Sequence, residues 1–310
     1  MLLLTLFLSA FYYLSLAHND QICALGGDKS RHRPVKMLIA VSNDYFDSFL
    51  NWLLFYHDVC GNDLSMMYFL CIDTKTEILM RKYSLKCSYS LQYGDSFRSM
   101  NRIWWTRMLV TKKLLQKGFD VISTDVDAIW LKNPFIEIAK LPRADVIVTR
   151  GKYPEDISQK FGAALCMGFI YIKTSELTID LWNNLVNSKS PHFNPDDQRE
   201  LNKYLAKGDI KFPVETLDYI NSTTTDIGRI TLPRGDLYVA VLPQNSYRRE
   251  CEGLNILDVL SSVIVHCSSD KIGASKQIAS SAIGIWKLKT NWKDVKFRTF
   301  DQFIKDVRVL

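Results

Sequence analysis

Apolar runs of strand length alternate with helical patterns through the first 125 residues of the chain. The runs at 35–41 and 66–72 are each followed by small polar residues and then by apolar residues at helical spacing, over 45–60 and from 74 to about 82. A third run, 87–93, is short and ambiguous. The clearest helix, 98–117, ends before a glycine and leads into a strand that finishes at Asp125. This alternation predicts an α/β fold, an open sheet of mainly parallel strands flanked by helices.

Polar residues stand where these strands end. Ser42 and Asn43 follow the first strand, Asp73 follows the second, and Asp125 follows the strand after the long helix. Ligands of open α/β sheets bind outside the carboxyl ends of the strands, so we expect these side chains along one rim. The sequence has neither G-x-G-x-x-G nor G-x-x-x-x-G-K-[ST], which argues against Rossmann dehydrogenases and P-loop enzymes.

The triplet Asp125-Val-Asp127 carries two carboxylates between apolar residues, with Val121-Ile122 before it and Ile129-Trp-Leu131 after it. In an extended segment, residues two apart point to the same side, so both carboxylates can converge on one point. Like charges held that close in apolar surroundings need a cation. Mg²⁺ or Mn²⁺ suits oxygen ligands and often completes its shell with phosphate oxygens. A bare D-x-D could also be a solvated turn.

The second half of the chain alternates less regularly. Strands are expected at 144–149 and at 162–172, where Gly168 interrupts the pattern, and a helix at 175–187. The loop 191–198 begins a helix that runs to 205, and 208–235 is polar and rich in turns. Strands at 237–242 and 262–266 should close the sheet, followed by a helix at 274–282. No internal break divides 35–310, which indicates a single catalytic domain.

Overall charge and the amino terminus limit the partners. The net charge is +6 with basic residues scattered singly, so nucleic acid is poorly supported as the main partner. Residues 1–17 are almost entirely apolar, as in a secretory signal peptide or a short signal anchor, with a buried helix as the alternative. Residues 18–34 are polar and are predicted to form a linker or stem. Any membrane contact should be made by the amino-terminal segment alone.

The seven cysteines show no C-x-x-C spacing, which makes a zinc site improbable. In an oxidising compartment some of them should pair, and the odd number leaves at least one thiol without a partner in the chain. The pairing itself stays open. Asn221-Ser-Thr223 is a glycosylation acceptor whose Ser/Thr-rich surroundings suit an exposed loop.

Taken together, these motifs resemble the nucleotide-diphospho-sugar transferase family of glycosyltransferases, which have the GT-A fold. The resemblance covers roughly residues 35–290. It is carried, in order, by residues 38–44 with Asn51-Trp52, by the D-x-D block 118–134, by Cys166-Met-Gly-Phe169, by Asp196-Asp-Gln198 with Asn202, and by His266 with Gly273 and Lys276. The D-x-D followed by Trp-Leu and Asn-Pro is far more specific than the triplet alone.

The resemblance implies a metal-dependent transferase, mostly retaining, that moves a sugar from a UDP-sugar to a glycan or glycoprotein. The enzyme would work in the secretory pathway, in the Golgi lumen as a type II membrane protein, or be secreted if residues 1–17 are cleaved. Its Mn²⁺ or Mg²⁺ ligands would be Asp125, Asp127 and His266. Donor-binding residues would be Ser42, Asn43, Asp73, Asp125, Gly168 and Lys276, and catalytic residues would be Arg107, Asp197 and Gln198.

Other interpretations stay open at this point. His266 could be a core histidine at a strand end, the Asp196-Asp197 pair a helix cap, Arg107 a surface charge and Gly168 a simple bulge. The alternative function is a catalytically inactive secretory protein of the same fold that binds carbohydrate or sugar nucleotide. A metal-dependent phosphohydrolase or nucleotidyltransferase is a third possibility. The residues do not identify the donor sugar, the acceptor or the linkage.

Overall fold

A computed structural model describes Cys23 and residues 33–90, 100–187, 196–267, 273–289, 291–294 and 300–308. The expected signal segment 1–17 and most of the expected linker 18–34 lie outside the described residues, as does the loop 191–195. Within the described ranges, no helix combines the length and apolar character needed to cross a membrane.

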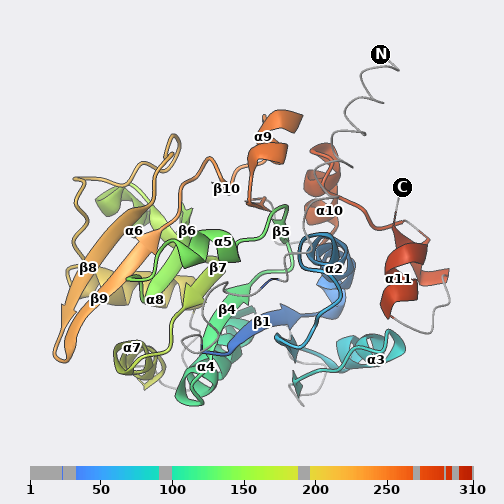
Figure 1. Ribbon diagram of the computed structural model, residues 1–310, viewed down its shortest axis with the longest axis horizontal. Helices are drawn as coiled ribbons and strands as arrows, with labels where there is room; N and C mark the ends of the chain where they lie inside the picture. Colours follow the sequence, from blue (N-terminus) through green and yellow to red (C-terminus); the bar gives the residue numbers. More distant parts are fainter. Residues whose placement is uncertain are drawn as a thin grey trace.

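A single large sheet forms the centre of the molecule (Figure 1). Six of its eight described strands run in one direction, while β7 and β8 run antiparallel to their neighbours. The expectation of a mainly parallel α/β sheet is therefore confirmed. In spatial order the strands are β3 (Tyr89–Ser90), β2 (Met67–Cys71), β1 (Val35–Val41), β4 (Asp120–Thr124), β7 (Ala164–Ile172), β6 (Val146–Gly151), β9 (Gly235–Val241) and β8 (Asp226–Leu232).

Helices cover both faces of this sheet because its strands are apolar on both sides. In β1, Met37 and Ile39 enter the core shared with α2 (Phe46–Cys60), whereas Leu38 enters the core shared with the helices opposite. The alternation follows from the two-residue period of a strand. The helices on that second face are α4 (Met100–Gln116), α7 (Glu176–Asn187) and α8 (Asp197–Lys207).

A second, three-stranded sheet differs from what the sequence predicted. The run 262–266 was expected to close the main sheet, but its strand β11 (Ile264–His266) pairs with β10 (Tyr247–Arg248) and β5 (Ala128–Trp130) instead. His266 lies opposite Ala128 in the β11–β5 register. Strands of two or three residues carry too little periodicity to be recognised. This small sheet brings the late histidine beside the D-x-D turn.

Several other elements were also not expected. The turn-rich region 208–235 contains the edge strand β8, which alternates buried and exposed residues. Short helices were missed because one or two turns give few repeats of the helical period. They are α5 (Phe135–Ala139), α6 (Glu155–Phe161), α9 (Ile256–Ser261) and, at the carboxyl end, α11 (Phe300–Val307), whereas α3 (Thr74–Lys82) and α10 (Gly273–Ala282) were expected.

Six of the seven cysteines form disulfides, Cys23–Cys60, Cys71–Cys87 and Cys251–Cys267, and the buried Cys166 is the unpaired thiol that the odd count required. Disulfides of this number are typical of proteins that fold in an oxidising compartment. Cys23, from the stretch expected to be a linker, is bonded to the end of α2.

Candidate active site

A cavity of about 180 Å³ opens at the carboxyl ends of β1 and β4. The two strands are parallel with Ile39 opposite Thr124, so the residues that follow them reach the same edge of the sheet. Ser42 and Tyr45 line the cavity after β1, and Trp104 and Arg107 of α4 form another wall. Its remaining polar lining is Asp125, Asp127, Arg249, His266 and Lys276.

The D-x-D turn is fixed by the core beneath it. The Asp125 amide donates to the Gly168 carbonyl at 2.9 Å, and the Ala128 amide donates back to the Asp125 carbonyl at 3.1 Å. The indole of the fully buried Trp52 donates to the Ala128 carbonyl at 3.0 Å and packs edge-on against Trp130. These contacts use backbone groups and aromatic side chains. The two carboxylates therefore take no part in fixing the turn through these bonds.

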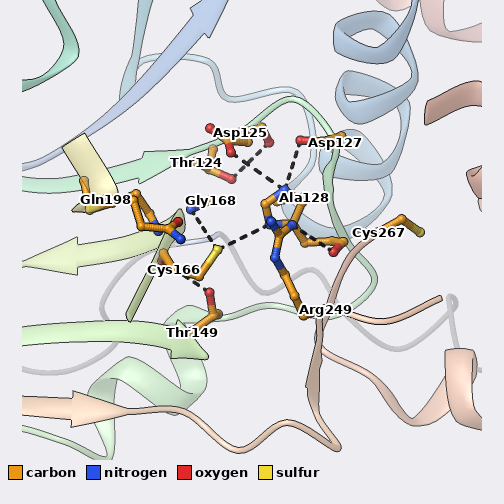
Figure 2. Close-up of polar contacts among 12 residues, drawn as sticks. Thr124, Asp125, Asp127, Ala128, Thr149, Cys166, Gly168, Gln198, Arg249 and Cys267 are labelled. Carbon is orange, nitrogen blue, oxygen red and sulfur yellow. Dashed lines mark hydrogen bonds and ion pairs between the residues drawn. The ribbon is translucent and has the colours of Figure 1, made fainter. Parts of the chain in front are cut away.

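Asp125, Asp127 and His266 come together at the edge of this cavity. His266 Nε2 lies 3.2 Å from Asp127 Oδ1 and 3.7 Å from Asp125 Oδ2. One ligand atom from each residue falls within 4.8 Å of the others, close enough for a shared ion. Two carboxylates and an imidazole fit Mn²⁺ or Mg²⁺, and they leave coordination positions for phosphate oxygens. Figure 2 shows Asp125 and Asp127 above Cys267, the residue that follows His266.

Gly168 leaves the room that His266 needs. A Cβ at position 168 would lie 2.0 Å from His266 Cε1 and 3.1 Å from Asp125 Oδ2. The β6–β7 pairing shifts register between Val148 and Thr149, opposite this part of β7. Both earlier interpretations of Gly168 therefore apply, because the strand is irregular here and the site approaches its backbone closely.

Two basic side chains form ion pairs with the carboxylates of the site. Arg107, only 4% exposed, donates through Nη1 to Asp125 and through Nε to Asp197, each at 2.5 Å. Arg107 is thus not a surface charge. Lys276 Nζ lies 2.8 Å from Asp127 Oδ2 and donates to the Cys267 carbonyl at 2.9 Å.

Burial and charge oppose each other at the site. Burial alone would favour a neutral Asp127, yet His266 and Lys276 together lower its pKa. Burial and Arg249 disfavour the charged form of His266, but Asp127 outweighs them and raises the pKa of the imidazole. Burial, Asp127 and Asp125 raise the pKa of the Tyr45 phenol to about 12, so this phenol keeps its proton at neutral pH.

The three residues at the start of α8 have separate contacts. Asp196 is the N-cap and accepts from the Arg199 amide at 2.9 Å, which confirms the helix-cap interpretation for this member of the pair. Asp197 is 2% exposed and turned to Arg107, and burial raises its pKa against the effect of that arginine. Gln198 accepts from the Met167 amide at 3.0 Å and donates to the Tyr153 carbonyl at 2.6 Å. Gln198 therefore adjoins the strand that carries Gly168.

Of the three residues expected to contact the nucleoside, only one lines the cavity. Ser42 lines the cavity, but Asn43 and Asp73 are not among its lining residues. The Asp73 carboxylate caps α3 through the Thr76 amide at 2.7 Å and accepts from the Asn43 amide at 3.0 Å. Asp73 thereby shapes the β1–α2 connection, while contact of these residues with a nucleoside stays a prediction.

Arg249, Tyr45 and Cys166 are the site residues that were not predicted as such. Arg249 follows β10 and lines the cavity, and its Nη1 donates to the His266 carbonyl at 3.3 Å. The Cys166 thiol lies 3.9 Å from His266 Nδ1, and although burial opposes it, Arg249 and His266 lower the pKa of this thiol to about 7. Arg249 belongs to none of the motifs that carry the family resemblance, so the sequence did not single it out.

Comparison with known proteins identifies the family. Residues 64–269 match the model for nucleotide-diphospho-sugar transferases, and the chain belongs to this family. The assignment confirms the resemblance on which the GT-A type of fold was expected.

Two curated proteins are similar over part of the chain. The UDP-galactose:fucoside alpha-3-galactosyltransferase of Dictyostelium discoideum is 28% identical over 114 residues, and the arabinosyltransferase XEG113 of Arabidopsis thaliana is 27% identical over 148 residues. These regions are 36% and 43% of this chain but only 17% and 22% of those proteins, so the chain matches less than a quarter of their length.

Among solved structures, the galactosyltransferase LgtC in complex with donor and acceptor sugar analogues is similar with a TM-score of 0.42 and 9% identity. The similarity covers 84% of this chain and 99% of LgtC. We transfer neither the donor nor the acceptor of LgtC to this protein.

Proposed function

We propose that the protein is a metal-dependent glycosyltransferase that moves a sugar from a UDP-sugar to a glycan or glycoprotein, with retention at the transferred carbon. One observation carries the proposal: Asp125, Asp127 and His266 converge beside a cavity that also presents Arg107 and Lys276. Membership of the nucleotide-diphospho-sugar transferase family supports a glycosyl donor. The Dictyostelium relative, named for UDP-galactose and a fucoside, supports UDP as the carrier.

Glycosyl transfer places negative charge on the departing diphosphate. When bound by Asp125, Asp127 and His266, a divalent ion supplies positive charge to the leaving group. Lys276, now bonded to Asp127, stands within reach of the same place and adds a second positive charge. No nucleophile triad is needed for this electrostatic role.

Arg107 and Asp197 act as a pair in this scheme. Asp197 fixes the Arg107 guanidinium from the protein side, and Arg107 in turn holds Asp125. A guanidinium has donors on three nitrogens in a fixed plane, so one arginine can orient two carboxylates at once. We expect Gln198, which bonds the Met167 amide, and the neighbouring Gly168 to face the transferred sugar.

The decisive experiment measures UDP release from a panel of UDP-sugars with Mn²⁺, with Mg²⁺ and with EDTA. We expect turnover of at least one donor only when a divalent ion is present. Asp127→Ala should lower kcat/KM by about a hundredfold or more, because it removes a ligand and the partner of Lys276. Asp156→Ala, on the exposed first turn of α6, is the matched control and should leave turnover unchanged.

Three outcomes would contradict the proposal: full turnover in EDTA, unchanged turnover by Asp127→Ala, or release of phosphate in place of UDP. Binding of a UDP-sugar without any product over hours would instead favour the inactive binding protein.

A further inference from the structure

The carboxylates of the site already have cationic partners. Asp125 and Asp197 share Arg107, and Asp127 is paired with Lys276. Each of these contacts is 2.8 Å or shorter. The three acids and two bases therefore pair with one another in two groups, Asp125–Arg107–Asp197 and Asp127–Lys276, which together form the ion-pair network of the site.

Arg249 stands outside this network. It lines the same cavity, yet no described residue offers it a carboxylate within ion-pair distance. Its one hydrogen bond among the described residues runs from Nη1 to the His266 carbonyl. A guanidinium has five N–H donors, so most of the donors of Arg249 are left for another acceptor.

The neighbourhood of Arg249 restricts what that acceptor can be. A guanidinium keeps its charge at physiological pH, so Arg249 brings a positive charge to the cavity. Arg249 is held against the backbone of His266, one of the three candidate metal ligands. A diphosphate carries oxygens on two adjacent groups, so one phosphate can reach the candidate metal ligands while the other reaches Arg249.

The charges of the site agree with this assignment. With Arg249 included, three basic side chains (Arg107, Lys276 and Arg249) balance three acidic ones (Asp125, Asp127 and Asp197). The two charges of a divalent ion would then balance the two charges of the diphosphate in a sugar nucleotide.

We propose that Arg249 binds the diphosphate of the donor through its free guanidinium donors, next to the candidate metal ligands. The inference rests on the proposed function in one respect, which is that the diphosphate belongs to a nucleotide. Binding of a diphosphate as such does not depend on the proposed function. Figure 2 shows Arg249 and Asp127 on one side of the site and Gln198 on the other, consistent with a leaving group and a sugar at separate ends.

The test compares three probes, UDP, uridine and inorganic pyrophosphate, each with Mn²⁺, by calorimetry and, for the weakest, by saturation-transfer NMR on the full chain. Arg249→Gln should weaken UDP and pyrophosphate by about tenfold to a hundredfold, the range expected for a charge-assisted hydrogen bond, and leave uridine within about twofold. Arg249→Lys keeps the charge but loses the forked geometry, so its loss should be intermediate.

Arg248→Gln is the matched control. Arg248 is the adjacent residue, but its guanidinium bonds Asp258 at 2.9 Å and Ser262 at 3.1 Å, away from the cavity. The Arg248→Gln variant removes a positive charge next to Arg249. If a general loss of positive potential were the cause, UDP affinity would therefore fall equally in both variants. We expect Arg248→Gln to change UDP affinity by less than about threefold, because screening weakens charges at a distance.

Three results would overturn the inference: unchanged UDP affinity in Arg249→Gln, an equal loss for uridine, or an equal loss in Arg248→Gln. If Arg249→Gln does not fold, Arg249→Lys decides by the same comparison. If the wild-type protein binds pyrophosphate but not UDP, and Arg249→Gln weakens the binding of pyrophosphate, the diphosphate site is supported and the proposed nucleotide donor is wrong. If it binds neither, both are wrong.

Discussion

Gly168 faces His266 with no room for a methyl group, since an added Cβ would lie 2.0 Å from Cε1 and 2.2 Å from Nδ1 of the imidazole. We expect Gly168→Ala to push His266 away from Asp127 and to weaken Mn²⁺ binding by about tenfold to a hundredfold, as when a ligand's supporting contacts are lost. The measurement is a Mn²⁺ titration in the presence of UDP, followed by calorimetry.

Gly118→Ala gives the opposite pattern and serves as control. Gly118 has φ +84° and no neighbour within 4 Å of an added Cβ, so alanine meets backbone strain but no contact. The variant should lose about 1–2 kcal/mol of stability and keep its Mn²⁺ affinity. If both variants lose stability and affinity in proportion, Gly168 has no special relation to His266.

Single residues could be predicted where their chemistry was unusual for their place. Asp125 and Asp127 were recognisable because carboxylates interrupted an apolar run, and His266 entered through the family resemblance. Arg249 gave no such signal, because an arginine beside another arginine is ordinary on a surface. Arg249 reaches the cavity only because it directly follows β10, a strand of the small sheet.

At the scale of elements, the order β1–α2–β2–α3 and the helix α4 before β4 followed from the sequence because each segment is long enough to show its period. The strands β5 and β10 were not predicted, because they have three and two residues. The strand β11 falls within the run expected at 262–266, but its pairing with β10 and β5 was not predicted, because these partners lie far apart along the chain. Part of the site depends on these short strands. Local sequence patterns were therefore insufficient to predict that part of the site.

The disulfide Cys251–Cys267 stabilises that small sheet close to the site. Cys251 comes two residues after Arg249, and Cys267 directly follows His266. Replacing both cysteines by serine should weaken UDP binding with Mn²⁺ by about tenfold or more, because the two segments lose their fixed separation. Calorimetry with UDP measures the affinity, and thermal unfolding measures the stability.

Cys71–Cys87 offers a matched comparison, since both disulfides join cysteines 16 residues apart. The chain-entropy model assigns each about 3 kcal/mol, so the two double-serine variants should lose similar stability. UDP affinity should fall much further in the Cys251/Cys267 variant. Equal affinities would show that the short sheet keeps its geometry without the covalent link.

For the whole molecule, α2 connects the site with the carboxyl-terminal part of the chain. Trp52 of α2 supports the D-x-D turn, and Asn51 accepts from the Lys287 amide at 2.7 Å and donates to the Ile285 carbonyl at 3.1 Å. The family match ends at residue 269, yet Lys276 of α10 lies beyond it and reaches Asp127. The site therefore requires that the last part of the chain stay docked on α2.

A buried carboxylate makes this docking sensitive to pH. Asp58 of α2 pairs with Lys287 at 2.5 Å and with Arg308. Burial favours its neutral form, but His57, Lys287 and Arg308 outweigh burial and lower the pKa of Asp58 from 3.8 to about 2. Since the folded pKa lies below the unfolded one, the ionised carboxylate stabilises the fold above about pH 4. This contribution is lost as the pH falls towards 2.

Asp58→Asn should therefore lower the free energy of unfolding by about 2 kcal/mol at pH 7, the value of a shift of nearly two pKa units. The difference from the wild type should shrink between pH 4 and pH 2, because the wild-type carboxyl then becomes neutral as well. Urea denaturation at pH 7, 5 and 3 measures it, with Asp156→Asn expected to change stability by less than about 0.5 kcal/mol at each pH. A destabilisation by Asp58→Asn that stayed constant down to pH 3 would mean that packing around the side chain, and not its charge, docks the end of the chain on α2.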